Sequence, residues 1–203
     1  MQAIDTLVHE HEVIEEALTL LGKVTQRARA GFPAPDGFAA WMIQFIRAFA
    51  DGYHHQKEEL ALFPLLERRG VPKEGGPLGC MLHEHELGRE LTRAMETAQS
   101  QGDLARFADA AEEYIVLLRE HIFKENVVLF RIAERCLHPG DDETLVSQFR
   151  AVDIATTPQR ESRRYLEEIK AWTQDLVEAS AGPAGPATRP QDTSLPIIAQ
   201  AQC

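Results

Sequence analysis

The chain has 203 residues, 44% of them hydrophobic and 26% charged, which fits one ordinary globular domain with a sizeable core. Its formal net charge of −11 disfavours a nucleic-acid partner, because such a surface repels phosphate backbones. The three cysteines show no C-x-x-C spacing, which suits a reducing compartment. The start lacks a signal-peptide pattern, and no apolar run approaches the roughly 18 residues of a membrane span. We therefore expect a cytoplasmic protein that contacts no membrane.

Helical periodicity dominates the chain, and strand patterns are nearly absent. The first helix is predicted to run from about Asp5, as its N-cap, to Gly31. In the second helix Asp36 is the expected N-cap, and Pro64 should kink or restart the helix because it lacks an N–H. The third helix is expected to begin at residues 77–80.

The fourth helix is expected to follow Gly102 and Asp103, a stop followed by a cap, and to end near residue 138 at HPGDD. Four long helices with short loops predict an all-α, up-down four-helix bundle over residues 1–140. An additional C-terminal helix is expected to pack on it at 141–179, with an interruption at TTPQ, residues 156–159. Residues 180–203 are rich in Gly, Pro and small polar residues and predict a flexible, disordered tail.

Seven of the eight histidines fall in four short segments, one in each predicted bundle helix. The first and third helices share H-E-H-E, and the second and fourth share H-x-x-K-E-x-x-x-L-F, so the chain reads as two similar helix pairs. At 100° per residue, six of these polar residues face the apolar side of their helices. This predicted inward set is His11, His54, Glu58, His85, His121 and Glu125.

Four neighbouring residues are predicted to lie outside the inward set. His55 is farther round its helix, while His9, His83 and Glu59 are expected on solvated faces. Lys57 and Lys124, each directly before a glutamate of the inward set, also lie near the inward face, and a simple metal site does not explain them.

The inward set predicts a metal site. Burying two carboxylates and four imidazoles without partners would cost several kcal/mol each, and a metal ion satisfies both kinds of ligand. Nitrogen and hard oxygen without thiolate favour iron or manganese over structural zinc. Six ligands exceed one closed tetrahedral site and could hold two metals with open positions. The alternative is that each histidine is an ordinary buried residue of a structural bundle.

At LVHEHEVI, HHQKEELALFP, GGPLGCMLHEHELGR and HIFKENVVLFR, which together organise residues 3–137, the chain resembles the hemerythrin-like (HHE cation-binding) family. The resemblance implies a four-helix bundle around two non-haem iron ions with oxo, hydroxo or carboxylate bridges. The implied ligands are His11, His54, Glu58, His85, His121 and Glu125.

Two positions depart from the oxygen-carrying hemerythrins. Those proteins have a second helix-three histidine where this chain has Arg89, and an Asp five residues after the last histidine, where Asn126 stands here. Glu125, four residues after His121, takes that role, and His55 or solvent is the expected substitute for the missing histidine. These departures disfavour reversible oxygen carriage.

Three functions stay open from the sequence. The first is binding of a small diatomic or peroxide ligand, in handling or sensing oxidative or nitrosative stress. The second is an enzyme that decomposes peroxide or converts nitric oxide, with Glu58 or Glu125 moving protons. The third is iron storage or sensing. The pattern does not choose among them, nor does it indicate an oligomeric state.

Overall fold

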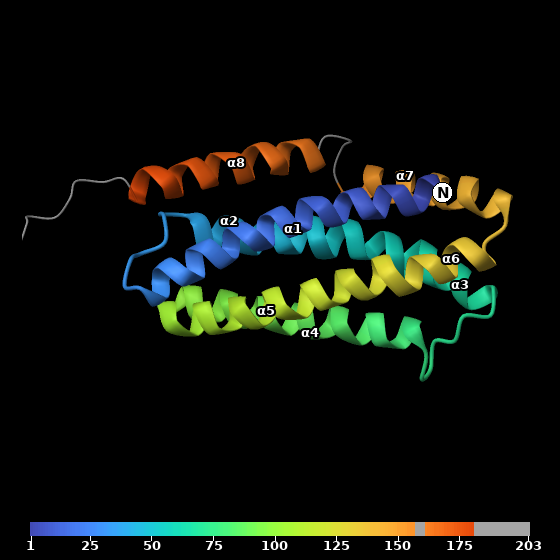
Figure 1. The fold of residues 1–203 in the computed structure, drawn as a ribbon, viewed down its shortest axis with the longest axis horizontal. Coiled ribbons are helices and arrows are strands. Elements are labelled where there is room, and N and C mark those ends of the chain that lie inside the picture. Colours follow the sequence, from blue (N-terminus) through green and yellow to red (C-terminus); the bar gives the residue numbers. More distant parts are fainter. Residues whose placement is uncertain (157–160, 181–203) are drawn as a thin grey trace, which may run out of the picture.

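The computed structural model describes residues 1–156 and 161–180, and no strand occurs among them. Four antiparallel helical rods form the bundle (Figure 1). The first rod is α1 (Gln2–Arg29) and the third is α4 (Pro77–Ser100). The second rod consists of α2 (Phe38–Phe45), the π-helical segments η1 (Ile46–His55) and η2 (Glu58–Leu62), and α3 (Phe63–Arg68). The fourth consists of α5 (Leu104–Lys124), the π-helical η3 (Glu125–Leu129) and α6 (Phe130–Cys136). The predicted all-α bundle is therefore confirmed.

The predicted C-terminal helical segment consists of two helices, α7 (Pro139–Thr156) and α8 (Glu161–Ser180). Both lie along α1 on the side of the bundle away from α4 and α5 (Figure 1). Trp172 of α8 packs edge-on against Phe38, while Leu145 and Phe149 of α7 join the core at the opposite end. The predicted interruption at 156–159 falls largely on residues 157–160, and the predicted tail falls on 181–203; both lie outside the described residues.

The buried interior has two apolar clusters with a polar layer between them. One cluster gathers the C-terminal half of α1 with α2, the end of α4 and the start of α5. The other gathers the N-terminal turns of α1 with α3, the start of α4 and α6. Between these clusters the buried side chains include His11, His54, Glu58, His85 and Glu125. Each apolar cluster closes one end of this layer and shields it from water.

Two of the predicted helix starts are wrong, for different reasons. The first helix begins at Gln2, not at Asp5, because the carboxylate of Asp142 in α7 accepts hydrogen bonds from the Gln2 and Ala3 backbone N–H groups at 3.0 Å each. Asp36 does not cap the second helix. The chain enters α2 through Gly37 at φ 81°, and no side chain caps that terminus. The first helix is thus capped from another helix, which its own sequence does not reveal.

Three other predicted boundaries are confirmed. The third helix begins at Pro77. Pro64 lies in the first turn of α3, where its missing N–H costs nothing. Asp103 caps α5, with its carboxylate accepting a hydrogen bond from the Arg106 N–H at 3.0 Å.

Loss of the Asp103 cap should be measurable. We expect Asp103→Ala to lower the free energy of unfolding by about 1 kcal/mol, because one N–H at the start of α5 loses its partner. Asp36→Ala is the matched control, since Asp36 is exposed and makes no cap, and it should change stability by less than about 0.5 kcal/mol. Urea unfolding of both variants measures the difference. Equal effects would contradict the assignment of the cap.

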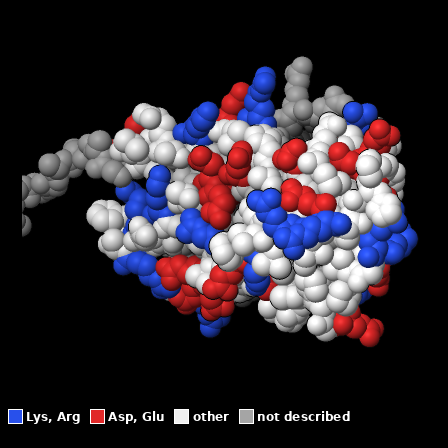
Figure 2. All heavy atoms as spheres, turned by 45° about the vertical axis from the view of Figure 1, so that its right-hand side comes forward, with Lys and Arg blue, Asp and Glu red and all other residues white. Residues whose placement is uncertain are grey.

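The surface mixes both signs of charge. On the face shown in Figure 2, groups of Asp and Glu lie next to groups of Lys and Arg rather than forming one continuous field. Exposed ion pairs such as Arg119–Glu15 and Arg47–Glu96 likewise place opposite charges side by side. Within residues 1–156 and 161–180, no helix combines the length and the apolar character needed to cross a membrane. Cys80 and Cys136 are free thiols, and Cys203 lies outside the described part of the chain.

Candidate metal centre

All six residues of the predicted inward set are buried in the polar layer, each with 2% or less of its surface exposed. His55, which was predicted farther round its helix, is buried as well, at 4%. His9 and His83 lie toward solvent, as predicted. Seven ionisable side chains from all four rods of the bundle therefore converge in the middle of the molecule.

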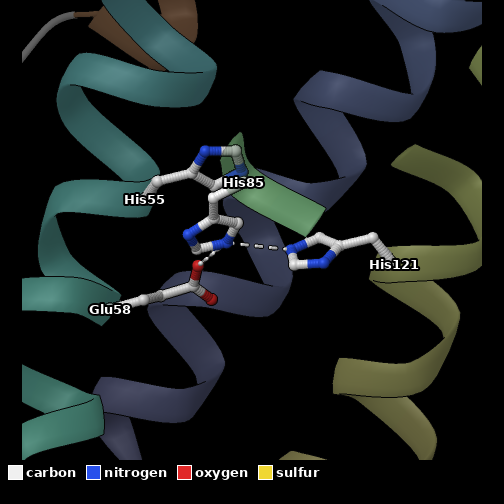
Figure 3. Close-up of side chains that lie close together, drawn as sticks. All are labelled: His55, Glu58, His85 and His121. Atoms are coloured by element: carbon white, nitrogen blue, oxygen red, sulfur yellow. Dashed lines mark hydrogen bonds and ion pairs between the residues drawn. The ribbon is translucent and has the colours of Figure 1, made fainter. Parts of the chain in front are cut away.

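These seven side chains form two groups that share one carboxylate. In the first group, ligand atoms of His11, His54, Glu58 and Glu125 lie within 4.8 Å of one another. In the second group the same holds for His55, Glu58, His85 and His121. Figure 3 shows the second group, with the His55 and His85 rings one above the other and His121 and Glu58 reaching toward them. The shared Glu58 lies where a carboxylate could bridge two ions.

Most metal-facing atoms of the two groups make no hydrogen bond within the described residues that would explain their burial. Both carboxylate oxygens of Glu58 and of Glu125 are buried without a hydrogen bond, as are Nε2 of His11 and of His54. Both ring nitrogens of His55 are in the same condition. Orphaned buried groups of this kind are costly and rare in native proteins. A pair of cations bound among them would satisfy these atoms together, so the residues present fit a metal centre.

Each histidine of the inward set turns its Nδ1 toward a fixed partner. His54 Nδ1 donates to Glu10 Oε2 at 2.9 Å, and His121 Nδ1 donates to Glu84 Oε2 at 3.0 Å. A carboxylate only accepts, so Nδ1 carries the proton and Nε2 keeps the lone pair that a metal needs. Partners of this kind orient histidine ligands in known metal sites.

The other two histidines follow the same rule with different partners. His11 Nδ1 lies 2.9 Å from Asn126 Oδ1, and His85 Nδ1 lies 2.6 Å from Glu59 Oε1. The prediction that Glu59 belongs to a solvated face is therefore wrong, because it is half-buried and holds His85. Asn126 and Glu59 occupy equivalent places, each directly after a glutamate of the inward set.

The orientation of His85 and His121 also indicates a cation. Their Nε2 atoms face each other at 3.1 Å, while their Nδ1 atoms are held by Glu59 and Glu84. Two lone pairs at this distance repel each other unless a positive charge lies between or beside them. A metal ion bound by both rings removes that repulsion.

Lys57 and Lys124, which the metal site alone did not explain, each pair with one of the orienting glutamates. Lys57 Nζ lies 2.5 Å from Glu10 Oε1, and Lys124 Nζ pairs with Glu84. Each lysine thus neutralises the glutamate that holds a histidine of its own rod. The two halves of the centre are related as the repeated motifs suggest. They differ in one respect: Lys57 is fully buried and also pairs with Asp153 of α7 at 2.9 Å, whereas the Lys124 side chain is 36% exposed.

The π-helical backbone explains why His55 lies inward. A π-helix closes its hydrogen bonds five residues apart rather than four, so the 100° rotation used for an α-helix overstates the turn between neighbours. His54 and His55 end η1, and both enter the polar layer. Arg89 lies nearby, but its guanidinium group is bonded to other residues and not to those of the centre. It donates instead to Asp51 at 2.8 Å and to Glu59 at 2.6 Å.

Burial favours the neutral form of three imidazoles of the centre. It lowers the pKa of His54 and His55 well below 6.5, and the neighbouring histidines lower these pKa values further. Burial also lowers the pKa of His85. Because only the neutral ring offers a lone pair, these shifts favour metal binding.

The two central carboxylates differ in their protonation. Burial, followed by the charge of Glu125, raises the pKa of Glu58 well above 4.5. Burial acts on Glu125 in the same direction, but the neighbouring His121 and His11 outweigh it and lower the pKa of Glu125 to about 2. Two carboxylates this close ionise together only beside a compensating cation.

The roles of Glu10 and Glu84 as partners of histidine Nδ1 atoms were not predicted, although the sequence contains a signal for them. Both are the glutamates that precede the inward histidines in the repeated H-E-H-E motif. Each accepts a hydrogen bond from a histidine of a neighbouring rod, not from a histidine of its own rod. The repetition of the motif was therefore the usable signal, since helical facing alone says nothing about contacts between rods.

Comparison with known proteins agrees with this geometry. The hemerythrin HHE cation-binding domain family matches residues 2–133. A Mycobacterium tuberculosis protein (Rv1995) is 30% identical over 185 residues, covering 88% of this chain and 68% of its own length. The iron-sulfur cluster repair protein YtfE of Musicola paradisiaca is 28% identical over 134 residues, covering 61% of this chain and 59% of its own. No solved structure matches. The chain belongs to the hemerythrin HHE cation-binding family, and its His/Glu cluster fits the metal site of such a protein.

Proposed function

We propose that the chain binds two non-haem iron ions in its polar layer and binds or reacts there with a small molecule such as dioxygen, hydrogen peroxide or nitric oxide. The observation that carries the proposal is the pair of four-residue groups that share Glu58, with their donor atoms otherwise unpaired. Imidazole nitrogen and carboxylate oxygen without thiolate favour iron in such a site. Handling or sensing of oxidative or nitrosative stress is the corresponding physiological role.

The proposed ligands divide between two ions. His11, His54 and Glu125 hold one ion, and His85, His121 and His55 hold the other, with Glu58 shared. His55 thereby takes the place of the histidine that Arg89 replaces. When bound, the iron pair supplies open coordination positions and exchange of one or two electrons. The protein's own part is to favour the neutral form of His54, His55 and His85, to fix ring orientation through Nδ1 and to limit the access of water with the two apolar clusters.

Metal analysis tests the proposal. Full-length protein produced with ample iron should contain about two iron ions per chain, and fewer than about 0.2 metal ions per chain would contradict it. Optical spectra after adding dioxygen, peroxide or nitric oxide then separate the possible roles. A species that releases oxygen under vacuum supports carriage, whereas rapid loss of peroxide with gas evolution supports a peroxide-decomposing enzyme.

A second candidate function is release of iron for the repair of iron-sulfur clusters. The observation that favours it is the similarity to a protein named for that activity, over 61% of this chain. Iron-loaded protein would then restore a [4Fe-4S] hydratase that peroxide has inactivated, and the protein would lose iron in proportion. A hydratase that recovers equally with metal-free protein would exclude this role.

A further inference from the structure

A cavity of about 190 Å³ opens onto one side of the candidate metal centre. Its walls include His55 and His85 from the second group of ligands, but none of His11, His54, Glu58 or Glu125. One molecule of water needs about 10–15 Å³ of such space, so the cavity has room for a molecule of a few atoms. This cavity therefore gives access to the centre from the side of His55 and His85, and not from the side of the first group.

Two of the three arginines in the cavity lining are paired with carboxylates. Arg89 lies there with its three guanidinium nitrogens bonded to Asp51, Glu86 and Glu59, at 2.6 to 2.8 Å. Arg47, another lining residue, pairs with Glu96. The third, Arg93, is exposed and has no ion pair among the described residues, so the lining carries a small excess of positive charge.

Besides the ring nitrogens of His55, the cavity lining carries a second polar group that the protein leaves without a hydrogen bond. Tyr114 is 2% exposed, and no hydrogen bond to its hydroxyl is found among the described residues. Burial, followed by the charge of Asp51, raises its pKa, so the phenol keeps its proton. Gly88, facing it from α4, leaves the ring edge clear, since a Cβ there would lie 3.6 Å from Tyr114 Cε2. A buried tyrosine hydroxyl usually has a partner.

We propose that this cavity is the binding chamber for a small molecule that accepts a hydrogen bond, and that the Tyr114 hydroxyl donates that bond. Dioxygen, nitric oxide and hydrogen peroxide have this chemistry. The proposal rests on the proposed function for its ligand. It adds that the ligand approaches the ion held by His55, His85 and His121 rather than the ion held by His11 and His54.

Xenon tests the chamber without depending on iron or activity. Crystals of the full-length protein under xenon pressure should show a xenon atom in the cavity lined by His55, His85 and Tyr114, because its volume of about 190 Å³ has room for the gas atom. Xenon at this place supports the chamber, and its absence from the cavity overturns it. This result stands whether or not the protein contains iron, so it is independent of the metal analysis.

Nitric oxide tests the role of Tyr114 in the iron-loaded protein. Tyr114→Phe keeps the ring and removes the donor, so the dissociation constant for nitric oxide should rise about fivefold while iron content stays unchanged. Tyr165→Phe is the matched control, since Tyr165 is a buried tyrosine packed against Phe45 and Phe49, away from the cavity lining, and it should leave the constant unchanged. An unchanged constant in Tyr114→Phe, with iron bound, would refute the hydrogen bond but leave the proposed di-iron site standing.

Discussion

Replacing Glu58 by alanine should lower the bound iron from about two ions per chain to well below one, with affinities weakened more than about 100-fold. The reason is that Glu58 belongs to both four-residue groups, so its loss removes a ligand from each ion at once. Iron content after dialysis against a weak chelator measures the effect. Glu12→Ala is the control, because Glu12 is an exposed glutamate of α1 whose carboxylate pairs with His9.

Glu59 gives a graded comparison with Glu58. Glu59→Ala should weaken binding of one ion by about 10- to 100-fold, because it removes the partner that orients His85 but no ligand atom. The two variants should therefore differ in iron content: Glu59→Ala should retain roughly one ion per chain, and Glu58→Ala almost none. If Glu58→Ala kept both ions while Glu59→Ala lost them, the assignment of the inward face would be wrong.

The sequence was sufficient for the bundle because the bundle depends on local patterns. Apolar stripes with helical spacing, Pro77 at a helix start and Asp103 at another all act within one helix. The convergence of the polar layer was also accessible, because each rod carries its histidine at a position that the apolar stripe places inward. Burial of His11, His54, His85 and His121 follows from that stripe alone.

Features that depend on contacts between helices were not accessible. Asp142 caps α1 from α7, a distance of about 140 positions along the chain, so the start at Gln2 had no local signal. The π-helical turns of η1 and η2 were missed because the pattern of apolar residues was interpreted with α-helical rotation. The assumed α-helical rotation misplaced His55, at the end of η1, and Glu59, in η2, because a π-helix turns less per residue.

The same limitation applied to the lysines, which seemed out of place only while each rod was considered alone. Lys57 and Lys124 occupy equivalent positions in the repeat, yet α7 covers only the first of them. Lys57 is fully buried between Glu10 and Asp153, while Lys124 reaches Glu84 at the edge of the bundle, with about a third of its side chain exposed. The chain therefore contains its own matched pair for measuring what burial adds to an ion pair.

We expect Lys57→Met to lower the free energy of unfolding by about 3–5 kcal/mol at pH 8, because it leaves the buried carboxylate of Glu10 without its cation. Lys124→Met should cost less than about 1 kcal/mol, since water can solvate Glu84 when the partner is lost. Urea unfolding of metal-free protein compares the two variants. Burial raises the pKa of Glu10 to about 7 despite Lys57, and loss of the lysine raises that pKa further. The cost of Lys57→Met should therefore shrink as the pH falls from 8 toward 7, because Glu10 of the variant binds a proton there while Glu10 of the unmodified protein is still ionised. Equal costs for the two lysines at pH 8 would show that α7 adds nothing to the ion pair it covers.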